Sequence, residues 1–582
     1  PRAPAERNAM LLDQLLPVAR GERPADLLLR NARVVNVFTG ELETTDVAIA
    51  SGVIVGVGPG YRAAQERDLA GRVLAPGFMD AHMHVESAMV PPAEFARAVV
   101  PQGTTTVVID PHEIANVFGA AGIDYLLAAR EGIPLDVFVM LPSAVPASHM
   151  ETAGAALSAA DLAPFMQHPA VLGVGEMMNF PGVIAGDPEV LRRAAIAGAK
   201  RVDGHAPGVR DQALNAYILA GVGSDHECTT VAEAEQRLRR GMYLMIREAS
   251  NARNLAALLP AVTPANSRRC LLVTDDRTPA DLLDEGHINF LVRKAIGLGL
   301  DPVIAVQMAT LNVAEYFGLR GRGAIAPGYR ADMVVLDDLS ADFAVLEVYR
   351  AGALVAANGQ LLAESRTGVP PLPNSVHLPA LTAASFAIPA AGERARIIGL
   401  VPDQIVTRAL SDTVRVENGM AVADPERDIL KLAVIERHGR GGAVGLGFVQ
   451  GFGLREGALA SSVAHDSHNI IVVGTNDADM LAAAQALAGM QGGQVAVAGG
   501  TVLAAVPLPI AGLMSDQPVE TVRAQVDALN AATRGLGCPL HAPFMALSFL
   551  ALPVIPSLKL TDQGVVDVEQ FALVPLFEDA QD

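Results

Sequence analysis

The feature of this sequence that most constrains its fold is an alternation, repeated eight times, of a short apolar run and a segment of helical composition. The apolar runs have the length of β-strands and end in polar residues. Their ends are Phe78–His84, Thr105–Asp110, Val137–Leu141, Val171–Glu176, Arg201–His205, Gly221–His226, Tyr243–Arg247 and Leu271–Asp275. Eight β-then-α units over about 250 residues are typical of a closed, TIM-like (β/α)8 barrel, and therefore of an α/β fold. An open doubly wound sheet is the weaker alternative, because reactive residue types follow many strands rather than one switch point.

Two β-rich segments flank the predicted barrel at residues 76–320. Residues 1–75 contain a helix followed by short β-rich runs separated by turn residues, and residues 321–365 return to a β-rich pattern. We predict that these two segments combine in one small composite β-sandwich domain. After a linker that contains several prolines, residues 380–582 contain short strands such as Ile470–Val473 and Gln494–Val497 and a helix at Asp477–Met490. This pattern predicts an additional C-terminal α+β domain.

The composition limits the classes of function. Sixty-three acidic residues against 43 basic ones give a formal net charge of -20, which argues against nucleic acid as a partner. The apolar stretches are short and broken by prolines, so no membrane-spanning helix is expected, although 51% of the residues are hydrophobic. Three scattered cysteines, Cys228, Cys270 and Cys538, are too few for a disulfide framework. With no visible signal peptide, they predict a cytoplasmic protein.

The densest local pattern is Pro76-Gly-Phe-Met-Asp-Ala-His-Met-His84, where two histidines stand two residues apart at the end of a predicted strand. Alternate residues of a strand point to the same face, so His82 and His84 can present two imidazoles to one cation. Imidazole is the commonest ligand of borderline divalent metals. Alone, such a pair is more often two ordinary loop histidines, because so short a pattern matches frequently by chance.

Four further residues favour a metal centre, because each ends another predicted barrel strand. Glu176 ends the fourth run, His205 and His226 end the fifth and sixth, and Asp275 ends the eighth. Six donors of this mix suit two metals better than one. We expect Glu176 to bridge the two metals, since each of its oxygens can serve one of them. We expect Asp275 to act as a ligand and as a proton shuttle.

On these residues the sequence resembles the amidohydrolase superfamily, which also carries a return segment like Gly323–Asp332. Within that superfamily it resembles the bacterial adenine deaminases over nearly the whole chain. The matching stretches are Pro76–Ser87, Asp110–Val117, Gly175–Val183, Asp203–Gly208, Leu214–Tyr217, Asp225–Glu227, Met245–Glu248, Thr274–Arg277, Glu285–Ile288 and Ala464–Asn469.

The resemblance implies a hydrolytic reaction in which adenine and water give hypoxanthine and ammonia. In that reaction a metal-bound hydroxide attacks C6 of the purine and Asp275 shuttles the proton. The resemblance also implies two divalent metal ions, manganese or iron(II), with zinc as a further candidate. The expected partner is a small purine base. Enzymes of this architecture are commonly closed symmetric oligomers, so we expect a homo-oligomer, in particular a dimer.

Further site residues are carried over from the resemblance. His112 is expected to donate a proton or polarise the reacting centre, and Glu113 to orient His112 or the purine ring. Glu113 and Glu227 are alternatives for the group that protonates N1. The residues expected either to hold an imidazole or to contact the purine are Glu86, Ser87, Glu227 and Asp276.

The resemblance also includes His465, Asp466 and His468 in the C-terminal part. A role as ligands and a role at a domain or subunit contact are both open for these three residues.

Two alternative functions are weighed against adenine deamination. A dihydroorotase-like hydrolase of a cyclic amide or amidine is disfavoured, because such enzymes usually bridge their metals with a modified lysine where this chain has Glu176. A non-catalytic barrel scaffold is disfavoured because such relatives lose metal ligands, and this chain retains all six candidates.

Overall fold

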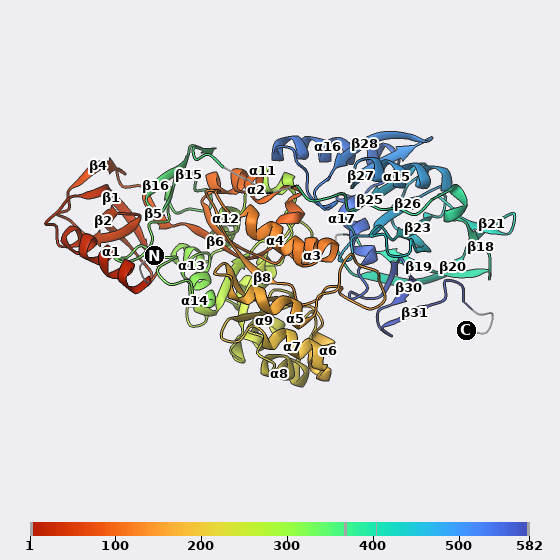
Figure 1. Ribbon diagram of the computed structural model, residues 1–582, viewed down its shortest axis with the longest axis horizontal. Coiled ribbons are helices and arrows are strands. Elements are labelled where there is room, and N and C mark those ends of the chain that lie inside the picture. Colours follow the sequence, from red (N-terminus) through yellow and green to blue (C-terminus); the bar gives the residue numbers. More distant parts are fainter. Residues whose placement is uncertain (1–3, 366–368, 370, 403, 579–582) are drawn as a thin grey trace.

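The fold is described from a computed structural model of the 582-residue chain. It describes residues 4–365, 369, 371–402 and 404–578, and side chains from residue 12 onward. Part of the predicted proline-containing linker, residues 366–368 and 370, lies outside the described residues. The barrel occupies the middle of the molecule, with an N-terminal β layer at one end and the C-terminal part at the other (Figure 1). Among the described helices, none is both long and apolar enough to cross a bilayer.

Eight parallel strands form the barrel, in the order of the sequence. They are β6 (Phe78–Met83), β7 (Thr104–Ile109), β8 (Asp136–Leu141), β9 (Val171–Met177), β10 (Arg201–Gly204), β11 (Ser224–Asp225), β12 (Tyr243–Arg247) and β13 (Cys270–Val273). Strands β6–β10 form one hydrogen-bonded sheet and β11–β13 a second. The last strand, β13, lies beside the first, β6, and just beyond β13 the amide of Asp275 donates to the carbonyl of His82 at 3.0 Å. This arrangement confirms a barrel-type α/β fold.

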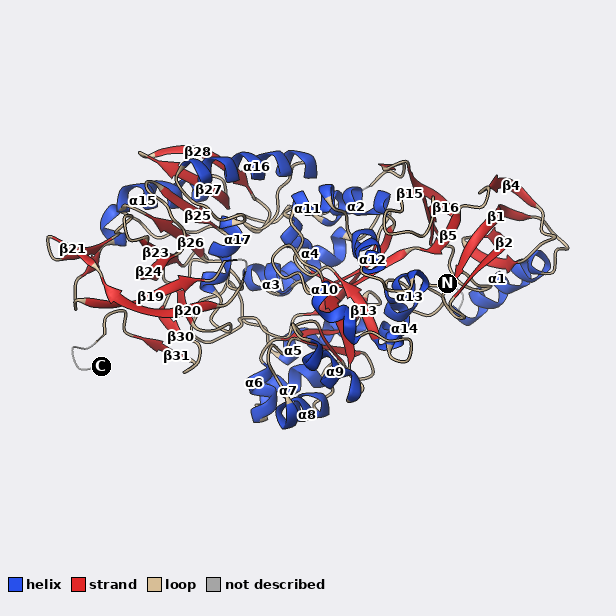
Figure 2. Cartoon of the chain, turned by 180° about the vertical axis from the view of Figure 1, so that it is seen from behind, coloured by secondary structure: helices blue, strands red, loops and turns tan. Residues whose placement is uncertain are grey.

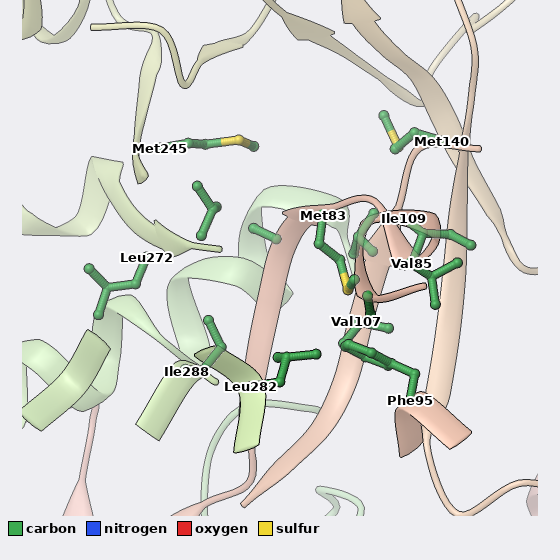
Figure 3. Close-up of a cluster of buried hydrophobic side chains, with 14 of the residues drawn as sticks. Met83, Val85, Phe95, Val107, Ile109, Met140, Met245, Leu272, Leu282 and Ile288 are labelled. Carbon is green, nitrogen blue, oxygen red and sulfur yellow. The ribbon is translucent and has the colours of Figure 1, made fainter. Parts of the chain in front are cut away.

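Helices surround these strands. They are α2 (Pro92–Val99), α3 (His112–Phe118), α4 (Ala120–Ala129), α5 (Ala159–Leu162), α6 (Phe180–Ala185), α7 (Pro188–Ala195), α8 (Asp211–Leu219), α9 (Val231–Arg239), α10 (Leu255–Leu258), α11 (Pro279–Asp284), α12 (Ile288–Gly297), α13 (Pro302–Met308) and α14 (Leu311–Phe317). Apolar side chains of the strands, such as Val107 and Leu272, pack with helix residues such as Phe95 and Ile288 in one buried cluster (Figure 3). Strands that are buried on both faces have continuous apolar sequences, and this is why the barrel strands could be predicted from the sequence.

The segments before and after the barrel share one nine-stranded sheet. Helix α1 (Pro4–Ala19) precedes β1 (Ala25–Asn36), β2 (Glu41–Ala50), β3 (Val53–Val57), β4 (Ala63–Asp68) and β5 (Val73–Pro76), and the return contains β14 (Met333–Leu336), β15 (Val345–Arg350), β16 (Ala353–Ala357) and β17 (Gln360–Leu361). The strand order is β17-β16-β15-β14-β5-β1-β2-β3, with β4 pairing β1. The two segments meet where β14 pairs antiparallel with β5. The structure thus joins them in a single hydrogen-bonded sheet, and the domain boundaries stay predictions.

The C-terminal part is built on an eight-stranded sheet of order β20-β19-β24-β23-β26-β25-β27-β28, with two small three-stranded sheets beside it. Its strands are β18 (Ile388–Pro389), β19 (Arg394–Leu400), β20 (Thr407–Thr413), β21 (Arg415–Glu417), β22 (Met420–Val422), β23 (Ile429–Ile435), β24 (Val444–Gln450), β25 (Ala458–Ser461), β26 (Ile470–Gly474), β27 (Gly493–Ala498), β28 (Thr501–Pro507), β29 (Leu558–Thr561), β30 (Gly564–Asp567) and β31 (Ala572–Val574). Its helices are α15 (Asp477–Gly489), α16 (Val519–Gly535) and α17 (Pro543–Ser548). Seen from behind, α3 and α17 lie where the barrel meets this part (Figure 2).

A buried carboxylate joins the barrel to the nine-stranded sheet. Asp136, the first residue of β8, accepts hydrogen bonds from Arg322 at 2.6 Å and from Arg330 and Arg350 at 2.5 Å. Burial raises the pKa of this carboxyl, but the three guanidinium groups outweigh that effect and lower the pKa to about 2. Because these arginines follow the barrel in sequence, the contact fixes the return segment against the first half of the barrel.

We expect Asp136→Asn to lower the midpoint of thermal unfolding by about 5–10 °C, since it removes the charge that compensates three partly buried cations. Differential scanning calorimetry measures this midpoint, and Glu22→Gln, in an exposed ion pair with Arg20, is the matched control. The stabilisation is present above the unfolded pKa of about 4 and is lost as the pH falls toward 2, because the folded-state pKa is the lower one. An unchanged midpoint in Asp136→Asn would contradict this role.

Candidate metal centre and active site

The six residues predicted as metal ligands meet at the carboxyl end of the barrel strands. His82 lies in β6, His84 directly after it, Glu176 in β9, His205 directly after β10, His226 directly after β11 and Asp275 two residues after β13. All six are buried. A barrel brings the last residues of all its strands to one face, which explains why residues almost 200 positions apart converge.

Glu176 stands between two pairs of histidines. Its Oε1 lies 3.1 Å from Nε2 of His84 and 3.9 Å from Nε2 of His82. Its Oε2 lies 3.0 Å from Nδ1 of His205 and 3.4 Å from Nε2 of His226. Each carboxylate oxygen therefore serves a different histidine pair, which is the geometry expected of a carboxylate that bridges two cations.

Asp275 completes the side of the centre that contains His82 and His84. Its Oδ1 lies 3.1 Å from Nε2 of His84 and 3.5 Å from Nε2 of His82. Its Oδ2 accepts a hydrogen bond of 3.0 Å from Arg247. One carboxylate oxygen thus faces the two imidazoles while the other is held by a guanidinium group.

The hydrogen bonding of this cluster fits a metal. Nε2 of His82 and Oε1 of Glu176 are buried and have no hydrogen-bond partner among the described residues. A carbonyl only accepts, so Nδ1 of His84 donates to the carbonyl of Asp110 at 3.0 Å, and the lone pair of its Nε2 points into the centre. Two donor sets, His82–His84–Glu176 and Glu176–His205–His226, each have their donor atoms within 4.8 Å of one another. They can hold two cations that share Glu176.

A second layer of contacts holds the loops that follow β10 and β11. Oδ1 of Asp225 accepts from the amides of Ala206 at 3.2 Å and Glu227 at 3.0 Å, and its Oδ2 accepts from Nε of Arg237 at 2.9 Å. Asp225 and Arg237 are both completely buried. Because these loops carry His205 and His226, the pair fixes two of the candidate ligands.

His112 and Glu113 are the first two residues of helix α3, and both are buried. Neither side chain is therefore a solvated group of a surface turn. Nδ1 of His112 lies 3.3 Å from Oε1 of Glu176, and its Nε2 lies 3.5 Å from Oε1 of Glu113. His112 thus stands between the candidate metal centre and Glu113.

The four flanking residues have different surroundings. The carboxylate of Glu86 accepts from the amide of Ile114 in α3 at 3.2 Å, and burial, followed by the charge of Glu113, raises its pKa to about 7. Ser87 donates to Asp276, which lies at the centre beside Asp275. Glu227 lies 3.5 Å from His205 and 3.4 Å from His226, and both of its oxygens contact Arg247.

Comparison with known proteins identifies the family of the chain. The amidohydrolase family model matches residues 73–362, and the model of the adenine deaminase C-terminal domain matches residues 404–572. An adenine deaminase of Desulfatibacillum aliphaticivorans is 54% identical over 98% of this chain and 100% of its own length. Adenine deaminase 2 of Carboxydothermus hydrogenoformans is 51% identical over 97% and 99%, and an adenine deaminase of Dehalococcoides mccartyi is 50% identical over 97% and 99%.

The chain belongs to the adenine deaminase family. The resemblance found in the sequence is thereby confirmed. The amidohydrolase family is metal-dependent, and the clustered histidine and carboxylate donors of this adenine deaminase family member agree with that.

Two groups of site residues escaped the sequence analysis. Arg247, which contacts both Glu227 and Asp275, lies in the Met245–Glu248 stretch shared with the adenine deaminases, and that stretch was the only available signal. The second group is the apolar part of the cavity wall contributed by the C-terminal part: Ile405, Phe549, Leu552 and Ile555. These residues carried no signal, because their sequence pattern is that of ordinary core residues. His465 and Asp466, which the resemblance includes, line the same cavity.

We expect Glu176→Gln to reduce the metal content of this adenine deaminase family member from two ions to less than one per chain, because a neutral amide is a poor bridge between cations. Elemental analysis after reconstitution with manganese measures the content. Glu189→Gln on the surface of α7 is the control and should bind as the unaltered protein does. Two ions per chain in Glu176→Gln would remove Glu176 from the ligand set.

Proposed function

We propose that this chain hydrolyses adenine to hypoxanthine and ammonia at the centre formed by His82, His84, Glu176, His205, His226 and Asp275. The observation that carries the proposal is the placement of two histidine pairs on opposite oxygens of Glu176, in a chain that matches adenine deaminases over almost its full length. The C6–N bond of the purine breaks, a C6–O bond forms from water, and the amine leaves as ammonia.

The donor set suits two divalent ions, and we propose manganese or iron(II), with zinc as a further candidate. When bound, such ions lower the pKa of water toward neutrality and so supply the attacking oxygen. The imidazoles and carboxylates described above would hold them, with Glu176 shared. That the enzyme works as a cytoplasmic dimer stays a prediction.

Asp275 is the proposed proton shuttle. Its Oδ1 faces the imidazoles of His82 and His84, so it can accept the proton that the attacking water loses and deliver it to the leaving amine. Arg247 keeps the other oxygen in place through its 3.0 Å hydrogen bond. Arg247 therefore orients the carboxylate of Asp275 and prevents it from turning away from the purine.

We propose that His112 polarises the purine, with Glu113 as the group that orients it. Burial raises the pKa of the Glu227 carboxyl, but the charge of Arg247 outweighs it and the net pKa lies below its usual range. Glu227 is therefore a carboxylate held by two hydrogen bonds from one guanidinium group, which suits an acceptor for a purine N–H.

The cavity wall contributed by the C-terminal part explains why the enzyme would prefer free adenine to its nucleoside, adenosine. In a purine whose C6 is at the metal centre, N9 lies at the opposite end of the ring system. The apolar side chains that the C-terminal part contributes to the cavity lining are those of Ile405, Phe549, Leu552 and Ile555. Lys559 links the segments of Ile405 and Phe549, because its Nζ donates to the backbone carbonyl of each residue at 2.9 Å. A ribose on N9 would have to displace this wall.

We expect Asp275→Asn to lower ammonia release from adenine by about 10²–10⁴-fold, because the amide cannot accept the proton. A coupled ammonia assay with manganese present measures the rate, and circular dichroism checks the fold. Asp284→Asn, an exposed carboxylate paired with Arg523, serves as the control and should keep full activity. Turnover of Asp275→Asn near that of the unaltered protein would refute the assignment.

A substrate panel of adenine, adenosine and dihydroorotate tests the reaction itself. We expect kcat/KM for adenine to exceed that for adenosine by at least about 100-fold, since the wall excludes the ribose. No turnover of dihydroorotate is expected. A preference for dihydroorotate would favour the cyclic-amide alternative. Inactivity toward all three, together with well under one metal per chain after reconstitution with manganese or iron(II), would favour the scaffold alternative.

A further inference from the structure

Glu113 is the point at which the barrel meets the C-terminal part inside the active site. Its Oε1 lies 2.9 Å from Nδ1 of His465, and its Oε2 contacts Nε2 of His468. All three side chains are buried, with exposed fractions of 2%, 5% and 0%. The loop between β25 and β26, more than 350 positions later in the chain, thus contacts both carboxylate oxygens of Glu113.

The protonation of His468 follows from its neighbours. The amide of Ala464 donates to Nδ1 of His468 at 3.2 Å, so that nitrogen is an acceptor and carries no hydrogen. The hydrogen of the neutral ring is then on Nε2, the nitrogen that contacts Glu113. The donors of Glu113, His465 and His468 lie close enough to hold a cation. However, a ring nitrogen that carries hydrogen is not a metal ligand, so Nε2 of His468 faces Glu113 as an N–H group and not as a metal donor.

His468 is anchored within the C-terminal part. Arg437 is completely buried and donates to the carbonyl of His468, to Ser375 Oγ at 2.9 Å and to the carbonyl of Ala511 at 2.9 Å. Burial lowers the pKa of His468 to about 4, which agrees with a neutral ring. The imidazole is therefore a fixed donor whose position is set by the C-terminal fold.

We propose that His465 and His468 are positioning residues that hold Glu113, and through it His112, in the orientation needed for deamination. The chain of contacts runs from His468 to Glu113, from Glu113 to His112 at 3.5 Å, and from His112 to Glu176 at 3.3 Å. The C-terminal part therefore completes the active centre of the barrel. The inference rests on the proposed function, since it assigns the orientation of a group in that reaction.

A double-mutant cycle on Glu113 and His468 tests the proposal. We expect Glu113→Gln and His468→Leu each to lower kcat for adenine by about 10–1000-fold, with KM changed less than about 3-fold and two manganese ions still bound. The double variant should be no slower than the slower single variant, because His468 acts only through Glu113. Losses that multiply would show a separate, structural role of His468 and would overturn the proposal.

Two further variants sharpen the cycle. His468→Gln can place an N–H close to the position of Nε2, so it should recover at least about a tenth of the original kcat. His438→Gln is the matched control, since His438 contacts the carbonyl of Ser467 in the same loop and, among the described contacts, does not reach Glu113. Its kcat should stay within about 3-fold of the original. A His468→Gln variant as slow as His468→Leu would contradict the donor role.

A measurement that needs no turnover separates this inference from the proposed function. In the full-length protein labelled with 15N-histidine, the resonance lost in His468→Gln should report a neutral ring with hydrogen on Nε2 at pH 7. It should shift in Glu113→Gln. A hydrogen on Nδ1, a charged ring or no shift would overturn the positioning role even in an active enzyme. Inactivity toward adenine with the expected resonance would instead refute the proposed function.

Discussion

A carboxylate enclosed by imidazoles at the mouth of the barrel is the interaction on which the site depends. Glu176 has five histidine nitrogens within 3.9 Å and is almost completely buried. An isolated buried charge is strongly unfavourable, so this arrangement is stable only with compensating groups around it. The parallel strands supply them, because each strand ends at the same face and delivers its last polar residue to one small volume.

Much of the barrel and of the ligand set could be predicted from the sequence, for a physical reason. Strands buried on both faces are largely apolar, so their ends are visible where polar residues begin, and Glu176, His205 and His226 were found at or just after such ends. His112 and Glu113, which follow the second predicted strand, were expected at the site from the resemblance. In the structure they begin helix α3, and both are buried.

What the sequence could not reveal depends on contacts between distant parts of the chain. Arg247 ends a barrel strand like other polar residues, and only the structure shows that it holds two carboxylates. Phe549 and Leu552 are apolar residues of a C-terminal segment, and nothing in their local pattern places them over a metal centre. The cluster of His465 and His468 was visible as a motif, but its contact with Glu113 depends on how the C-terminal part meets α3.

The nine-stranded sheet has a consequence for how the protein is made. Strand β5 leaves the ribosome before the barrel, whereas its neighbour β14 begins only at Met333, after the eighth barrel strand. During synthesis the edge of β5 that pairs with β14 stays unpaired while about 250 residues emerge from the ribosome. At about 5–20 residues per second this takes from about ten seconds to nearly a minute. Until the return segment arrives to cover it, this edge is the place where a nascent chain is most exposed to pairing with the wrong neighbour.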